Sequence, residues 1–176
     1  GRLVIDIADN PIKCPVAPLE FAFYADAFFT ERGMRDKVSI TYVTPLSGAF
    51  TKPRSSKLLG SLLESKNIEM VTDFFLSEVD NENKIIIDFG GQEIHFDCLV
   101  TIPLHSGDDI ILNSGLGDEF GFVRADKFTL QSTVKENVFV LGDAGNFPTS
   151  KAGSVVHFQA DILTENLMCY IEERPF

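Results

Sequence analysis

The sequence predicts an α/β fold in which a mostly parallel sheet is flanked by helices and extended by an antiparallel meander. Two observations support this prediction. Strand-like and helix-like segments alternate through residues 1–102, which is the order typical of parallel β-α-β units. Within that stretch a glycine pair separates two short apolar runs, a pattern that indicates an antiparallel hairpin.

The first β-α-β unit is the clearest part of the pattern. Residues 3–8 form an apolar run that predicts a buried strand, and residues 17–32 follow as a helix with apolar side chains repeating every four positions. Pro18 is acceptable in the first turn of a helix, and Gly33 supplies its C-terminal stop. Residues 38–43 are rich in β-branched side chains and predict the second strand.

The remaining elements of this region follow in the same way. A helix is expected at 55–65, with four leucines as its apolar stripe: Leu58, Leu59, Leu62 and Leu63. Further strands are expected at 68–71, from 73–76 onward, at 84–89 and 93–96 on either side of Gly90-Gly91, and at 98–102. This order predicts a Rossmann-like three-layer domain with an antiparallel β meander over residues 1–102.

The residue pattern changes after Pro103, which suggests a second domain over residues 103–176. Residues 104–120 are rich in Gly, Asp and Ser and are expected to form loops, whereas 122–134 is expected to hold two short strands. Residues 137–141 predict a clear strand. A last helix is expected at 153–172, with one apolar face made by Val156, Leu163, Leu167 and Ile171.

Composition excludes some classes of partner and favours others. The chain has 26 acidic and 15 basic residues and a formal net charge of -11, which argues against nucleic acid as a ligand. No apolar run approaches the ~20 residues of a membrane span, and the chain opens without Met or a signal peptide, as a fragment of a longer protein would. Three widely spaced cysteines argue against a zinc site and fit a reducing, cytoplasmic location.

The strongest chemical signal is the segment Val138–Ala144. Here a predicted strand is followed by Gly142, Asp143 and Ala144, and a predicted helix comes after them. Glycine permits close approach of a ligand to the backbone, and a carboxylate accepts hydrogen bonds from sugar hydroxyls. The alternative interpretation is an ordinary strand-turn-helix in which Asp143 caps the helix.

The string NVFVLGDAGNFPTSKAG (137–153) resembles the second flavin-contacting motif of FAD-dependent pyridine nucleotide-disulfide oxidoreductases, and among them most resembles the sulfide:quinone oxidoreductases. The resemblance implies an FAD/NAD(P)-binding type of fold, with 1–102 as a degenerate second dinucleotide-binding domain and 103–176 as the C-terminal part of the FAD-binding domain. It further implies that Asp143 bonds the ribityl chain of FAD. The cofactor-binding residues would be Gly142, Asp143, Ala144, Pro148, Thr149 and Lys151.

The resemblance is incomplete at the nucleotide-binding turns. The glycine-rich FAD fingerprint of the family's N-terminal region is not in this sequence. A nicotinamide-binding domain also needs G-x-G-x-x-G after its first strand, yet no glycine lies between Ala8 and Gly33. The second strand ends in Val43-Thr44-Pro45, without the acid that holds an adenosine ribose. We therefore expect that this domain no longer binds NAD(P)H.

Cys14 stands where the pyrophosphate would have been bound. A thiolate there would be favoured by the following helix N-terminus and by Lys13, although a lone cysteine is more often structural. The segment KCPVAPLE resembles the cysteine-proline segment of sulfide:quinone oxidoreductases, whose cysteine carries sulfur beside the flavin. That mechanism usually needs a second cysteine. Cys98 is expected in the core and Cys169 in helix packing, so the partner lies outside this sequence or the protein departs from the pattern.

His105 is the third position of interest. The run Ile102-Pro103-Leu104-His105 resembles the family's return of the chain to the flavin domain. His105 could exchange a proton with a quinone, or it could make a structural hydrogen bond. His95 and His157 show no comparable context.

Together these features predict part of a flavin-dependent oxidoreductase of the sulfide:quinone type, with FAD as cofactor and Cys14 and His105 as catalytic residues. The implied partners are sulfide or a small sulfur compound and a quinone or other electron acceptor, in a homo-oligomer peripheral to the membrane through regions outside this sequence. The enzymatic alternatives are the flavin subunit of a flavocytochrome sulfide dehydrogenase and a type II NADH dehydrogenase. The non-enzymatic alternative is a degenerate Rossmann interaction domain.

Overall fold

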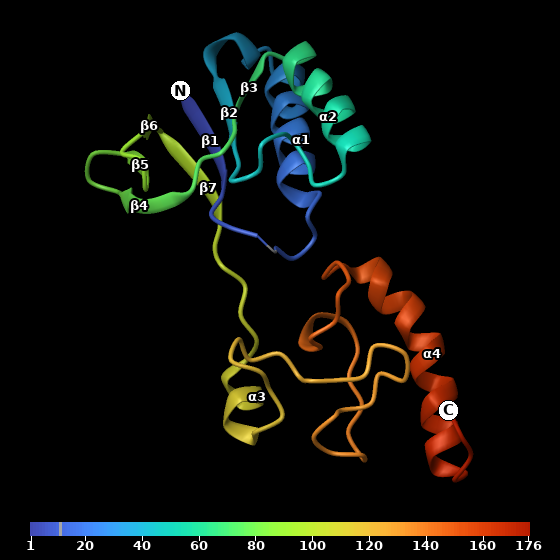
Figure 1. The fold of residues 1–176 in the computed structure, drawn as a ribbon. Coiled ribbons are helices and arrows are strands. Elements are labelled where there is room, and N and C mark those ends of the chain that lie inside the picture. The colour runs from blue at the N-terminus through green and yellow to red at the C-terminus, as the bar shows by residue number, and fades with distance from the viewer. Residues whose placement is uncertain (11) are drawn as a thin grey trace. The chain divides into compact units, whose positions relative to one another are not determined.

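The computed structural model describes residues 1–10 and 12–176, and the chain forms two compact units (Figure 1). Unit 1 comprises Gly1–Ile12 and Val16–Leu104, and unit 2 comprises Lys13–Pro15 and His105–Phe176. The sequence predicts a division after residue 102. Its linear patterns give no indication that residues 13–15 pack with the second unit rather than the first.

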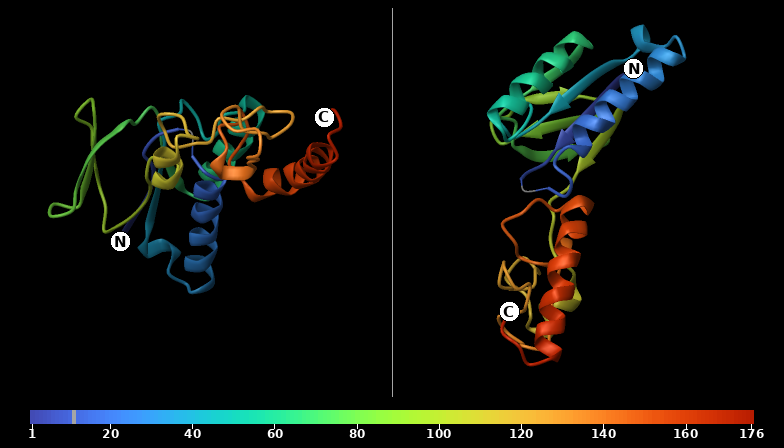
Figure 2. Two further views of the ribbon diagram at one scale, coloured as in Figure 1. Left: turned by 90° about the horizontal axis from the view of Figure 1, so that it is seen from below. Right: turned by 90° about the vertical axis from the view of Figure 1, so that its right-hand side faces the viewer.

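Unit 1 is built on a parallel sheet with the strand order β3-β2-β1-β7. Its strands are β1 (Arg2–Ile7), β2 (Ser39–Val43), β3 (Ile68–Val71) and β7 (Cys98–Ile102), and every neighbouring pair is parallel. The helices α1 (Ala17–Glu31) and α2 (Pro53–Ser65) pack on one face of this sheet, with η1 (Arg35–Lys37) between α1 and β2 (Figures 1 and 2).

The other face of the sheet is covered by an antiparallel meander of β4 (Leu76–Asp80), β5 (Ile85–Asp88) and β6 (Glu93–His95). A second core lies between the two sheets, made by Val4, Val43, Phe74, Ile86 and Phe96. The predicted α/β fold with three layers and a meander is therefore confirmed.

Three local expectations in unit 1 need correction. The fourth strand begins at Leu76 rather than at Asp73, because Asp73 has a φ of 56° and donates its N–H to the Leu46 carbonyl, in the loop after β2. On α2 only Leu63 is buried, whereas Leu58 is 71 % exposed, because that side of the helix points away from the sheet. Cys98 is exposed instead of buried, since it is the first residue of an edge strand.

Two buried carboxylates in unit 1 have opposite surroundings. Asp26 on α1 accepts from Arg35 Nε at 2.6 Å and from Lys66 Nζ at 2.7 Å. Burial alone would raise the pKa of Asp26, but the hydrogen bonds from Lys66 and Arg35 outweigh it and lower the pKa. Among the described residues, Asp6 on β1 accepts only from Thr101 Oγ1, at 2.8 Å, and its Oδ1 has no partner. Burial raises the pKa of Asp6 to about 6, although the Thr101 bond opposes the shift.

Unit 2 contains the helices α3 (Asp109–Ser114) and α4 (Gly153–Ile171) and the short 3-10 turn η2 (Gly142–Ala144). Helix α3 lies where loops were expected; Asp108 caps it by accepting from the Ile110 N–H, and Gly115 ends it with a φ of 73°.

The strands expected in unit 2 are reduced to isolated bridges. Phe139 pairs with Gln131, and Ala125 pairs with Ser132. The expected strand at 137–141 is therefore wrong as a continuous element, because within the described residues it has one neighbour over one residue pair. On α4 the expected apolar face is only partly covered, since Leu163 packs on the core while Ile171 is exposed. In the described part of the chain, no helix has the length and apolar character needed to cross a membrane.

Candidate functional site

Two distant segments of the sequence meet within unit 2. Lys13 and Lys151 form a parallel β-bridge, and the Cys14 N–H donates to the Lys151 carbonyl at 2.6 Å. The predicted thiol and the end of the predicted ring-side loop are thus in direct backbone contact, although 137 positions separate Cys14 from Lys151 in the printed sequence.

Cys14 is held in an uncommon conformation. Its φ of 47° lies in the left-handed region, which costs a non-glycine residue on the order of 1 to 3 kcal/mol. Such a conformation persists only where the surroundings impose it. The backbone bond to Lys151 is one such constraint, and the side chain of Cys14 is half-buried rather than enclosed.

The turn that carries Asp143 depends on a glycine. Gly142 has a φ of 67°, and a Cβ at this position would lie 2.6 Å from Val156 Cγ2 on α4. Its N–H donates to Oε1 of the buried Gln159 at 2.7 Å. The turn is therefore docked on the first two turns of α4, and only glycine fits there.

The Asp143 carboxylate points to a cation rather than to a helix end. Its Oδ2 lies 3.5 Å from Lys13 Nζ, and both side chains are about half exposed. Neither η2 nor α4 has a side-chain cap, so the alternative interpretation of Asp143 as a capping residue is wrong. The exposed ion pair is weak, which leaves the carboxylate able to accept from a ligand hydroxyl.

Lys151 joins three parts of the site. Its ammonium donates to the carbonyls of Asp143 at 2.8 Å and Gly145 at 3.0 Å, and it lies 3.9 Å from the centre of the Phe122 ring. Burial lowers the pKa of Lys151, and Lys13 adds to this, while Asp143 opposes it. These bonds cannot be predicted from sequence motifs, because they join a side chain to backbone carbonyls.

His105 contacts the residue that precedes Cys14. Its Nδ1 accepts from the Lys13 backbone N–H. Burial lowers the pKa of His105, the charges of Lys13 and Lys151 lower it further, and Asp143 opposes them. An imidazole nitrogen that accepts a hydrogen bond is unprotonated, so the ring is neutral and carries its proton on Nε2.

The predicted ring-side loop has an anchored start and an exposed middle. Phe147 is buried in the core of unit 2, whereas Pro148 and Thr149 are exposed and Ala144 is half-buried. Exposed small and polar residues next to Asp143 could line one side of a planar ligand.

The other cysteines do not join Cys14. Cys169 is buried near the end of α4, and the helical rise of about 1.5 Å per residue puts it roughly 24 Å from Gly153, where α4 begins. Cys98 is an exposed residue of unit 1. His95 and His157 contribute no bond to the site residues described above. Within the part of the chain that the structure describes, no group of three potential metal ligands occurs.

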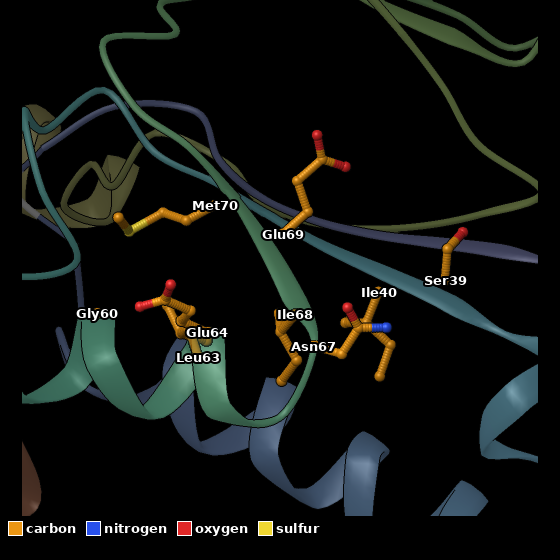
Figure 3. A pocket seen from close by; sticks show the side chains of 9 residues that line it. All are labelled: Ser39, Ile40, Gly60, Leu63, Glu64, Asn67, Ile68, Glu69 and Met70. Carbon is orange, nitrogen blue, oxygen red and sulfur yellow. The ribbon is translucent and has the colours of Figure 1, made fainter.

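A pocket of about 560 Å³ lies in unit 1 between α2 and β3 (Figure 3). Leu63, Ile68 and Met70 contribute apolar walls and Glu64 contributes a carboxylate, whereas the carboxylate of Glu69 accepts from Thr41 Oγ1 and points away from α2. None of the residues predicted from the motifs lines this pocket, so we assign no role to it.

Comparison with curated proteins supports the resemblance drawn from the sequence. The chain is 31 % identical to the mitochondrial sulfide:quinone oxidoreductase of Mus musculus, over 99 % of this chain and 40 % of that protein. It is 29 % identical to the mitochondrial sulfide:quinone oxidoreductase of Dictyostelium discoideum, over 94 % of this chain and 37 % of that protein. The chain thus spans about two fifths of these relatives. No family model matches it.

Solved structures share the fold at lower identity. The sulfide:quinone oxidoreductase of Aquifex aeolicus matches with a TM-score of 0.85 and 20 % identity, over 99 % of this chain and 45 % of that one. A chain in the mitochondrial ATP synthase of Tetrahymena thermophila matches with a TM-score of 0.74 and 20 % identity, over 99 % of this chain and 44 % of that one. Over the part of those proteins that it spans, the chain is therefore related to the sulfide:quinone oxidoreductases, as its two motifs predict.

Proposed function

We propose that the chain is part of an FAD-dependent oxidoreductase of the sulfide:quinone type, in which Cys14 reacts with sulfide or a related sulfur compound. The observation that carries this proposal is the hydrogen bond from the Cys14 N–H to Lys151, in the loop that follows the Asp143 turn. It joins the two segments that resemble the family, and that geometry is needed if a thiol is to face a flavin.

The residues present fit the ribityl and ring side of FAD. The Lys13 ammonium approaches Oδ2 of Asp143, which leaves Oδ1 for a ribityl hydroxyl. Gly142 lets the backbone approach a ligand, and Ala144, Pro148, Thr149 and Lys151 would lie along the ring. The sequence has no glycine-rich turn for the pyrophosphate, so that part of the cofactor site would come from outside these residues.

When bound, FAD would accept two electrons from the sulfur substrate and pass them to a quinone. The Cys14 thiolate and a hydrosulfide ion would form a sulfur–sulfur bond, giving a deprotonated Cys14 persulfide, one proton released to water and two electrons, which the bound flavin would accept. With Nδ1 accepting from the Lys13 N–H, the neutral ring of His105 would present its Nε2–H as a hydrogen-bond donor.

Cys14 would work without a second cysteine of unit 2, because Cys169 is 5 % exposed and sits at the far end of α4. The sulfur on Cys14 would therefore pass to an external acceptor, or to a cysteine outside these residues. A type II NADH dehydrogenase remains disfavoured because the turn after β1 contains prolines instead of glycines. The flavin subunit of a flavocytochrome sulfide dehydrogenase would differ only in its electron acceptor.

One observation favours a second candidate, a non-catalytic subunit that uses this fold for assembly. A chain with this fold is present in the Tetrahymena mitochondrial ATP synthase structure. The lack of a second thiol beside Cys14 in unit 2 is compatible with that role. A location peripheral to a membrane suits both candidates, and the curated relatives are named as mitochondrial, whereas the sequence pattern alone predicts the cytoplasm.

The absorbance of the intact protein separates the two candidates. A flavoenzyme should show the flavin bands and lose them on addition of sulfide under anaerobic conditions. Cys14→Ala should abolish bleaching by sulfide while leaving reduction by dithionite intact, and Cys98→Ala is the matched control. Bleaching that survives Cys14→Ala would remove this thiol from the mechanism, and a colourless protein that does not take up FAD would favour the assembly role.

A further inference from the structure

His105 and Lys151 hold two consecutive backbone amides from the same segment. The Lys13 N–H donates to His105 Nδ1, and the Cys14 N–H donates to the Lys151 carbonyl. Neither acceptor belongs to a regular sheet, since the pairing of residue 13 with residue 151 is an isolated bridge. We call this pair of contacts the amide clamp.

The two acceptors of the amide clamp differ in one respect. A backbone carbonyl accepts a hydrogen bond at any pH, whereas an imidazole nitrogen accepts only while it is unprotonated. Protonation of His105 therefore turns the acceptor of the Lys13 amide into a donor. The two N–H groups would then oppose each other, and the bond must break.

We propose that His105 is a positioning residue that sets the conformation of Cys14, and that protonation of its ring releases the segment that carries the thiol. Cys14 is strained at a φ of 47°, so its conformation needs the bonds made by its own N–H and by the N–H of Lys13. His105 acts through the Lys13 amide and needs no contact with the reacting sulfur. The proposal deepens the proposed function, because Cys14 is the thiol on which that function depends.

Three charged groups face His105. The ammonium of Lys13 on the held segment and the ammonium of Lys151 before α4 oppose protonation of the ring, whereas the carboxylate of Asp143 on η2 favours it. Burial, together with the two ammonium groups, outweighs Asp143 and keeps the pKa of the ring below its ordinary value of 6.5. The amide clamp is therefore closed at neutral pH and opens only on acidification.

Amide hydrogen exchange of the 176-residue chain, resolved at Lys13 and Cys14, tests the amide clamp without any variant. One hydrogen bond contributes about 1 kcal/mol, so the protection of the Lys13 amide should fall about five- to tenfold between about pH 7.5 and pH 5, after correction for intrinsic exchange. Equal protection at both pH values would overturn the proposal.

Variants of His105 separate positioning from a general effect of acid. His105→Asn keeps an acceptor near the place of Nδ1 but does not titrate, so Lys13 should stay protected at both pH values. His105→Leu removes the acceptor, and Lys13 should be unprotected at both. His157→Asn, on the exposed face of α4, is the matched control and should behave as the unchanged chain does. A His105→Leu chain that keeps its Lys13 protection would contradict the role of the ring.

Thiol reactivity gives the second readout. At about pH 7.5, alkylation of Cys14 by iodoacetamide should be roughly fivefold faster in His105→Leu than in His105→Asn, because losing one hydrogen bond frees the half-buried thiol. Peptide mapping is needed, because Cys98 is exposed and will also react. Equal rates in the two variants would contradict the proposal. Neither readout uses flavin or sulfide, so failure of the sulfide chemistry would leave this result standing on its own.

Discussion

The two units of this chain are stabilised in different ways. Unit 1 is held by repeating backbone ladders, with four parallel strands in register and a meander on the opposite face from the helices. Unit 2 has isolated bridges, and its turns are fixed by side chains that bond to the backbone, as Lys151 does to Asp143 and Gly145. All of the predicted site residues lie in unit 2. Regular hydrogen bonding supplies a scaffold here, and irregular hydrogen bonding positions the residues of the predicted site.

The comparison predicts that single changes in unit 1 act on stability, and the largest effect is expected at Asp26. Asp26→Ala should lower the free energy of unfolding of unit 1 by about 3 to 4 kcal/mol, because it leaves Arg35 and Lys66 without their buried anion. Exchange of the β1 amides would report the loss, while the α4 amides should change little. Asp36→Ala, on the exposed surface of η1, is the control. An equal loss in both units would mean that they unfold together.

In unit 2 the largest effect is expected at a backbone position. Gly142→Ala should destabilise η2 by about 3 kcal/mol, since it combines a left-handed conformation with a Cβ placed 2.6 Å from Val156 Cγ2. Gly153→Ala is the control, because a Cβ there meets nothing within 4 Å. Melting followed by circular dichroism, with exchange at α4, would measure the effect. Similar stabilities for the two variants would contradict the packing described for the turn.

Asp6 should make the stability of unit 1 depend on pH. Burial raises its folded pKa to about 6, above the ordinary value of 3.8, so the folded state binds the extra proton. Stability should therefore fall as pH rises from about 4 to 6, by about 3 kcal/mol in total. Asp6→Asn should remove most of this dependence and stabilise the chain at neutral pH. Glu93→Gln, on exposed β6, should retain the dependence. A flat stability profile for the unchanged chain would contradict the burial of an unpaired carboxyl oxygen.

The smallest effect is expected at the Lys13–Asp143 ion pair. Lys13→Met should cost less than about 1 kcal/mol in stability, because both side chains are about half exposed and water screens their attraction. The same change should leave the Lys13 backbone amide protected, since that bond does not involve the side chain. A loss of protection in Lys13→Met would show that the ion pair, and not His105, holds the segment.

Much of unit 1 can be predicted from the sequence because the apolar residues of its strands and helices recur at a regular spacing. The strands at 39–43 and 68–71, the hairpin at Gly91 and the helix α1 follow directly from apolar spacing and turn residues. What periodicity cannot give is which side of a helix finds a neighbour, and Leu58 and Leu62 on α2 are exposed for that reason.

The site is less predictable, since its contacts join residues far apart in the chain. Cys14 and Asp143 are visible as motifs, but the Lys151 carbonyl that accepts from Cys14 carries no sequence signature. The same limit explains 137–141, whose apolar pattern indicates a strand although the described residues supply a partner only at Gln131. The sequence pattern of a segment indicates which secondary structure it can form, and the neighbouring segments determine whether that structure forms.

The chain crosses between the two units three times, after residues 12, 15 and 104. No single cleavage point can therefore separate them cleanly. A truncation that ends at Leu104 would retain Cys14 but discard both acceptors of its neighbouring amides, and one that starts at His105 would lack the thiol altogether. Proteolysis or domain-by-domain expression would accordingly be expected to yield two pieces, neither of which holds the Cys14 thiol together with the Asp143 turn, even where the larger piece still folds.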